Sequence, residues 1–219
     1  MQTGAADSVT TARRRRQAAG PSRPAAWAPD LSLFLAAVTL VYTLVIFDGL
    51  HKLFRDSDAG WHIRTGERIL ASGELPRTDP YSFTRAGEPW IDWEWAADVA
   101  AGAAHRAWGL RGVALLFAVA IALSTWLWVR LTWAAGGDFL LASVLAAPML
   151  STANLHWLAR PHVFGWALLV GWMWILERGS LGSFSRFHAV GAAVFGCVWA
   201  NVHASFFLGV LTGLLYAAG

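Results

Sequence analysis

Long apolar segments interrupted by short polar clusters constrain this chain more than any other feature. The segment from Leu31 to Phe47 is almost entirely apolar, and at about 1.5 Å per residue a helix of that length nearly crosses a hydrocarbon layer. Hydrophobic residues make up 56% of the chain and charged residues only 14%, whereas an average soluble domain is about 25% charged. One water-soluble core of this size cannot bury so much apolar surface. We therefore expect an all-α protein, a multi-pass transmembrane helix bundle.

Six segments are predicted to be the membrane spans. They are residues 31–50, 112–129, 138–153, 161–176, 187–200 and 204–218. The last four are short for a complete crossing, and short or interrupted segments often line a polar cavity. The loop 51–111 mixes charges of both signs with glycine and proline, so it cannot lie in lipid. Within it, residues 59–71 and 92–108 are predicted to form amphipathic interfacial helices.

The N-terminal region differs in composition from the rest of the chain. Arg13 to Arg16 and Arg23 lie among alanine, glycine, proline and serine, which predicts a disordered basic tail at 1–30, before a transmembrane domain at 31–219. Positive charge collects on the cytoplasmic side of a membrane, so we expect a cytoplasmic N-terminus. No aromatic residue or folded element accompanies the arginines, which argues against nucleic acid and favours contact with anionic membrane lipid.

Three polar clusters interrupt the apolar sequence, and counting the spans places all three outside the cell. The loop 51–111 follows the first span, 154–162 follows the third, and 201–203 follows the fifth. We therefore predict one site near the outer leaflet. Its members would be Asp56, Asp58, His62, Asn154, His156, Arg160, His162, Asn201 and His203.

The first cluster offers acid–base or metal chemistry. The carboxylates of Asp56 and Asp58 could bind a divalent cation or act as a general base toward a hydroxyl group. His62 follows Asp58 by one helical turn, and oxygen and imidazole ligands together suit Mn²⁺, Mg²⁺ or Zn²⁺. The alternative is that Asp58 only caps the helix that follows it.

The other two clusters offer binding groups. The guanidinium of Arg160 suits a lipid-linked phosphate, although a headgroup anchor is the simpler role. Polar residues at membrane depth, such as Asn201 and His203, usually line a cavity or bond two helices together. Trp61 could stack on a sugar, but an interfacial belt explains the tryptophans equally well.

An ordered set of motifs resembles the GT-C class of membrane glycosyltransferases, and in particular its bacterial multi-pass members. The resemblance runs from about residue 31 to the end of the chain. The matching positions are Asp58, Trp61, His62 and Gly66; Pro76, Asp79, Pro80, Tyr81 and Ser82; Trp90, Glu94 and Trp95; Arg160, Pro161 and His162; and Trp199 to His203.

The resemblance implies transfer of a sugar from a polyprenyl-phosphate donor to an acceptor on the outer face of the bacterial inner membrane. It puts the catalytic or metal-binding role on Asp56 or Asp58, and Asp58 is favoured because it begins the motif. Beside these carboxylates, His62 would be a further ligand for a divalent Mn or Mg ion. The implied substrate-binding residues are Arg160, His162, His203, Asn201 and Trp61.

Proteins of this class have more spans, and this chain ends within apolar sequence. We therefore expect it to be the N-terminal portion of such a protein. Two alternatives stay open. One is a transporter or lipid-handling protein that uses the same polar residues as a substrate path, and the other is a truncated membrane protein without catalytic activity.

Overall fold

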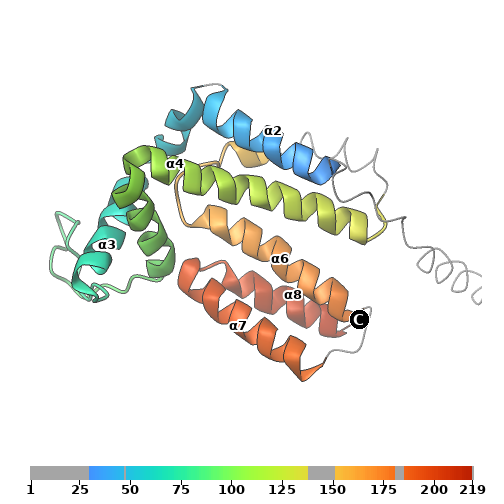
Figure 1. The fold of residues 1–219 in the computed structure, drawn as a ribbon. Coiled ribbons are helices and arrows are strands. Elements are labelled where there is room, and N and C mark those ends of the chain that lie inside the picture. Colours follow the sequence, from blue (N-terminus) through green and yellow to red (C-terminus); the bar gives the residue numbers. More distant parts are fainter. Residues whose placement is uncertain (1–29, 47, 138–150, 181–184, 219) are drawn as a thin grey trace, which may run out of the picture. The chain divides into compact units, whose positions relative to one another are not determined.

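The structure is a computed structural model that describes residues 30–46, 48–137, 151–180 and 185–218. Within these residues every regular element is a helix (Figure 1). The elements are α2 (Leu31–Val45), the 3-10 helix η1 (Gly49–Phe54), α3 (Asp58–Ser72), α4 (Trp95–Ala134), α6 (His162–Ser180), α7 (Arg186–Val202) and α8 (Phe206–Ala218). The expected all-α class is therefore confirmed.

Backbone contacts divide the chain into two units, Met1–Leu31 and Ser32–Gly219. The tail predicted at 1–30 lies outside the described residues except for its last position. The third predicted span, 138–153, lies outside them except for its last three residues.

The first apolar segment forms a shorter helix than predicted. The segment 31–50 was expected to be one helix, but α2 ends at Val45. Asp48 and Gly49 follow in the left-handed region, with φ of 73° and 54°. A right-handed helix cannot continue through such residues, so the chain turns and starts the 3-10 helix η1.

The charged loop holds the two helices that its sequence predicts. A helix at 59–71 is confirmed by α3, and the helix expected at 92–108 begins at Trp95 and is interrupted at Trp108 and Gly109, before the apolar segment 112–129, which forms the second part of α4. A kink at Trp108 and Gly109 separates the two parts, because Gly109 has φ 60° and ψ −152°. Only glycine adopts this conformation readily.

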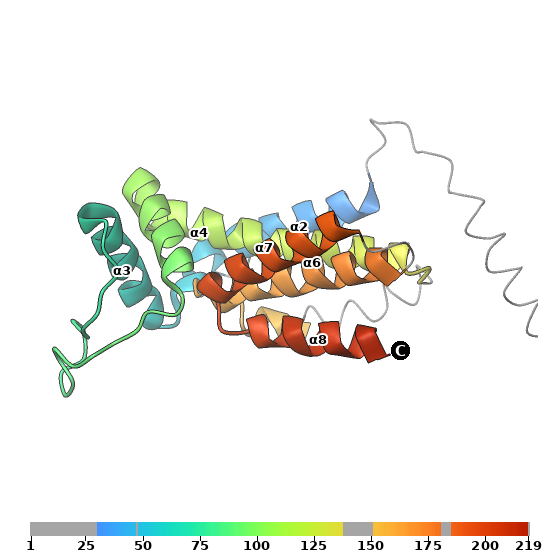
Figure 2. The ribbon, with the colours of Figure 1, turned by 90° about the horizontal axis from the view of Figure 1, so that it is seen from below.

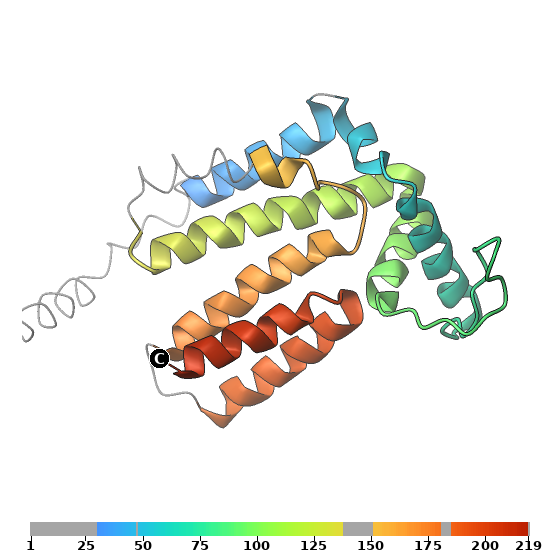
Figure 3. The ribbon, with the colours of Figure 1, turned by 180° about the vertical axis from the view of Figure 1, so that it is seen from behind.

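Two glycines let α3 pack closely against the first part of α4, and the two segments lie side by side in Figures 1 and 3. A Cβ atom on Gly66 would lie 1.7 Å from the backbone oxygen of Asp98, and one on Gly102 would lie 2.5 Å from the backbone nitrogen of Glu67. The backbones of the two helices therefore touch, and side chains beside the contact are held at short distances.

The second part of α4 packs against α6, and α6 packs against α7 and α8 (Figure 2). The apolar core joins residues of η1, α3 and α4 to the segment that leads into α6. Its fully buried members include Leu53, Val113, Phe117 and Val163. The core thus fixes the start of α6 against the loop 51–111. One predicted polar cluster lies in that loop, and another, 154–162, leads into α6.

Several helices turn apolar side chains outward and polar ones inward. In α2 the buried residues include Ser32, Thr39 and Thr43, whereas Leu33 and Phe34 are 60% and 59% exposed. By length and composition, one helix among the described residues, Trp95–Trp133, is long and apolar enough to cross a membrane. The helices Leu31–Val45 and Phe206–Ala218 are apolar but shorter. The multi-pass bundle therefore stays a prediction.

Candidate functional site

Arg160 joins two of the predicted polar clusters. Its Nη1 atom lies 2.9 Å from Oδ2 of Asp56, and its Nη2 atom lies 2.7 Å from Oδ2 of Asp58. All three side chains are partly exposed, between 25% and 36%. One guanidinium thus contacts two carboxylates of a segment that lies more than a hundred residues earlier in the chain. All three groups remain accessible at the protein surface.

Local backbone contacts position this ion pair. The backbone N–H of Ala159 donates to the backbone oxygen of Leu53 at 2.7 Å, which ties the segment before α6 to η1. Asp56 accepts a hydrogen bond of 2.9 Å from the backbone N–H of Asp58. That hydrogen bond, together with Arg160, lowers the pKa of Asp56. Asp56 is therefore a stable carboxylate at neutral pH.

The alternative role for Asp58 as a simple helix cap is wrong. The helix α3 begins at Asp58 itself, its N-cap residue is Ser57, and no side-chain hydrogen bond caps it. The carboxylate of Asp58 instead contacts Arg160.

His62 lies behind this ion pair in the contact between α3 and α4. Its Nδ1 atom is 2.6 Å from Oδ1 of Asp98, and the two side chains are 2% and 0% exposed. Burial lowers the pKa of His62 to about 4, against the opposing effect of the nearby Glu94. The imidazole is therefore neutral at pH 7, and one hydrogen bond joins its Nδ1 atom to Oδ1 of Asp98.

Glu94 lies between two histidines. Its Oε2 atom is 3.9 Å from Nε2 of His62, and its Oε1 atom is 3.3 Å from Nε2 of His203. Burial raises the pKa of Glu94 and lowers that of His203 to about 4. The backbone N–H of Ser205 donates to Nδ1 of His203 at 3.1 Å, so the ring proton of the neutral imidazole lies on Nε2, facing Glu94.

The remaining substrate-binding candidates have different surroundings. The rings of His162 and His203 lie 6.4 Å apart, so His162 belongs to the same cluster. Asn201 accepts a hydrogen bond of 2.7 Å from Trp95 and donates one of 2.8 Å to the backbone oxygen of Cys197. Both ends of its amide are occupied, which matches the expected alternative of a helix–helix hydrogen bond.

Trp61 packs against Tyr81 and Trp90 in an aromatic group whose ring centroids are 5.9 to 6.4 Å apart.

The cluster at 154–162 divides in two. Asn154 accepts a hydrogen bond of 3.4 Å from Lys52, which is only 7% exposed and lies over the ring of Tyr42. The backbone oxygen of His156 accepts from Nε2 of His162 at 2.8 Å. Asn154 thus has a partner of its own, whereas Arg160 and His162 lie with the acidic residues.

The donor set does not fit the metal ion that the resemblance implies. In the part of the chain that the structure describes, no three His, Cys, Asp or Glu side chains are grouped so as to hold an ion. The carboxylates of Asp56 and Asp58 already face the cation of Arg160, and His62 is directed at Asp98.

Sequence reasoning missed two acids of the cluster as functional candidates. Glu94 was named only as one motif position, and Asp98 was not singled out. The sequence does hold one indication of their role. Glu94 and Asp98 are four residues apart, and acids at this spacing share one face of a helix. That face of α4 otherwise carries small apolar residues such as Ala97 and Ala101, which are buried.

A scan of family models and searches of curated proteins and of solved structures found no match to this chain. The cluster must therefore be interpreted from its own chemistry. It combines a partly exposed ion-pair group of Arg160, Asp56 and Asp58, able to exchange partners with an anionic ligand, and two neutral histidines around the partly buried Glu94. Such a set can bind a phosphate and accept a proton from a hydroxyl group.

Proposed function

We propose that the chain is, or belongs to, an integral membrane glycosyltransferase of GT-C type. It would transfer a sugar from a polyprenyl-phosphate donor to an acceptor hydroxyl on the outer face of a bacterial inner membrane. The observation that carries this proposal is the ion pair of Arg160 with Asp56 and Asp58, a phosphate-binding cation held against two candidate bases.

The outward apolar faces support a membrane location. Besides α2, the helix α8 buries Gly209 and leaves Val210, Leu211, Leu214 and Leu215 at least half exposed. In water this orientation would be unfavourable, since exposed apolar area costs about 25 cal/mol per Å². In lipid it is the expected orientation, because small and polar residues mediate helix contacts there.

An apolar groove beside the polar cluster supports an amphipathic substrate. The groove has a volume of about 350 Å³ and lies between α4, α6 and α7. Leu116, Phe164 and Val202 are among its lining residues, and Val202 directly precedes His203. A polyprenyl phosphate has a long apolar chain and one charged end, and so could occupy the groove and reach the cluster together.

The proposed reaction assigns one task to each group. The acceptor hydroxyl gives its proton to the carboxylate of Asp58, and the acceptor oxygen forms a bond to the anomeric carbon of the donor sugar. The bond from that carbon to the phosphate oxygen breaks, and the electron pair leaves with polyprenyl phosphate. Arg160 moves from the carboxylates to the phosphate and stabilises its charge.

The test measures the transfer of sugar from donor to acceptor in proteoliposomes that contain the protein. The donors would be polyprenyl-phosphate mannose and polyprenyl-phosphate glucose, and the acceptors would be glycolipids extracted from a bacterial envelope. Asp58→Asn should lower transfer by about 10²-fold or more, because loss of a general base typically has that effect. The same variant should still bind polyprenyl phosphate, since Arg160 keeps its charge and loses one of its two carboxylate partners.

The matched control is Asp48→Asn, which breaks an exposed ion pair of 3.5 Å with Arg55 in the same region. Full transfer by Asp58→Asn would refute the mechanism. Binding of polyprenyl phosphate without any sugar transfer by the unmodified chain would favour a lipid-handling protein instead.

A further inference from the structure

We propose a second ligand site, on the opposite side of α3 from His62, that binds a phosphate group. Four residues of α3 form one stripe along that side: Arg64, Glu67, Arg68 and Ala71. Their spacing of three and four residues brings them onto the same face of a helix. The proposal does not depend on glycosyl transfer.

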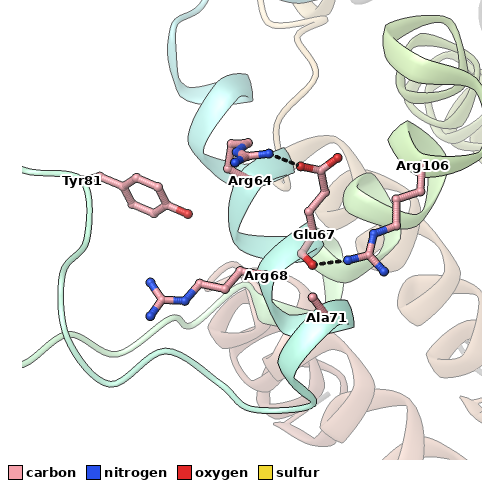
Figure 4. A pocket seen from close by; sticks show the side chains of 6 residues that line it. All are labelled: Arg64, Glu67, Arg68, Ala71, Tyr81 and Arg106. Atoms are coloured by element: carbon pink, nitrogen blue, oxygen red, sulfur yellow. Dashed lines mark hydrogen bonds and ion pairs between the residues drawn. The ribbon is translucent and has the colours of Figure 1, made fainter.

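The helix α4 and the following loop complete the site. Arg106 of α4 and Tyr81 of the loop join the stripe around a cavity of about 550 Å³. Figure 4 shows Tyr81 and Arg68 on one side of the α3 axis and Arg106 on the other, with Glu67 between them. The hydroxyl of Tyr81 lies 2.9 Å from that of Thr65, which holds the loop side of the cavity.

The charge in this cavity is predominantly positive. Its single acid, Glu67, already contacts Arg64 at 2.7 Å and His105 at 2.6 Å. The hydrogen bond from His105 lowers the pKa of Glu67, so this side chain is a carboxylate at neutral pH. The lining of the cavity therefore carries three arginines and one carboxylate.

Two of the arginines retain donors for a ligand. Arg106 uses one nitrogen to donate to the backbone oxygen of Glu67. The guanidinium of Arg68 makes no hydrogen bond or ion pair with any residue that the structure describes, and it extends toward the side of Tyr81 (Figure 4). A guanidinium presents five N–H donors in a planar fork that matches phosphate oxygens.

The shape of the cavity favours a phosphate with an organic substituent. Its volume lies within the usual range for small-molecule sites, and the short side chain of Ala71 leaves that end of the stripe open. The shared chemistry is a phosphate ester. It could be the headgroup of an anionic phospholipid, or a water-soluble phosphate compound.

The experiment uses the full chain and two probes. Glycerol 3-phosphate would be titrated into detergent-solubilised protein by calorimetry. Nanodiscs of phosphatidylcholine, with and without phosphatidylglycerol, would be compared using spin-labelled phosphatidylglycerol. The test variant is Arg68→Gln, which removes a side chain without protein partners and should fold normally. The matched control is Arg77→Gln, which removes an exposed arginine of the same loop outside the cavity.

We expect Arg68→Gln to weaken binding about tenfold, the effect of one charge-assisted hydrogen bond, and Arg77→Gln to leave binding unchanged. A response to glycerol 3-phosphate would identify a soluble ligand, and a response confined to phosphatidylglycerol would identify a lipid headgroup. The proposal is overturned if neither probe binds the unmodified chain, or if the two variants lose equal affinity, because the effect would then be one of net charge.

Discussion

Replacement of Gly66 by alanine should separate α3 from α4 and disrupt the polar cluster. The added Cβ atom would lie 1.7 Å from the carbonyl oxygen of Asp98 and 2.4 Å from its carbonyl carbon. Ordinary contacts of carbon atoms are about 3.5–4.0 Å, so the two helices would have to move apart by roughly 2 Å. Both opposing atoms belong to the backbone, and no side-chain rotation can relieve the contact.

The expected cost follows from this geometry. Overpacking costs about 1–3 kcal/mol, and a rigid backbone contact places Gly66→Ala at the upper end of that range. The higher helix propensity of alanine compared with glycine stabilises the folded state by about 1 kcal/mol and offsets part of this cost. We expect a net loss of about 2 kcal/mol, which corresponds to a fall in Tm of about 4–8 °C for a chain of this size.

Gly60 provides a matched control in the same helix. A Cβ atom on Gly60 would meet nothing within 4 Å, so Gly60→Ala should gain up to about 1 kcal/mol of helix propensity. Thermal unfolding of both variants in detergent, followed by tryptophan fluorescence, measures the difference. If Gly66→Ala unfolds at or above the temperature of Gly60→Ala, the close packing of α3 on α4 is refuted.

Three further predictions concern the cluster and its setting. The pKa of His203 is lowered from 6.5 to about 4, so the unfolded chain binds this proton more readily, and stability should be lost as pH falls from about 6.5 to 4. His203→Gln should make the pH dependence of the free energy of unfolding shallower over that interval, by at most about 1.4 kcal/mol per pH unit. An unchanged dependence in thermal unfolding at each pH would contradict the assignment. Trp95→Phe should cost about 1 kcal/mol by leaving the amide oxygen of Asn201 without its donor, whereas Trp93→Phe, at a side chain that is 65% exposed, should not change Tm. In a Cys197→Ser background, Arg77→Cys should react with an impermeant maleimide in intact cells and Arg178→Cys should not; the reverse pattern would invalidate the proposed topology.

Much of the helical framework could be predicted from apolar runs and turn signals. The helix at 59–71 and the apolar helices toward the C-terminus follow from patterns that act over a few residues. Helix ends were predicted less well. The end of α2 depends on the left-handed residues Asp48 and Gly49, and the kink within α4 depends on the backbone conformation of Gly109. Such backbone conformations are chosen by packing as well as by residue type.

The site could be predicted in part for a similar reason. Polar residues stand out in apolar sequence, so Asp56, Asp58, Arg160 and His203 were found without a structure. Asp98 was not found, because one acid in a helix of the charged loop is unexceptional in sequence. Its complete burial against His62 distinguishes it in the structure.

The sequence by itself determined that this chain is helical, rich in apolar surface and interrupted by polar clusters, because hydrophobic periodicity and turn residues act locally. The tertiary structure decided which polar residues meet. Arg160 reaches Asp56 and Asp58 because the segment before α6 is hydrogen-bonded to η1. His62 reaches Asp98 because two glycines allow α3 and α4 to touch. These pairings join residues far apart in the chain, and they depend on the packing of whole helices, which no local pattern records.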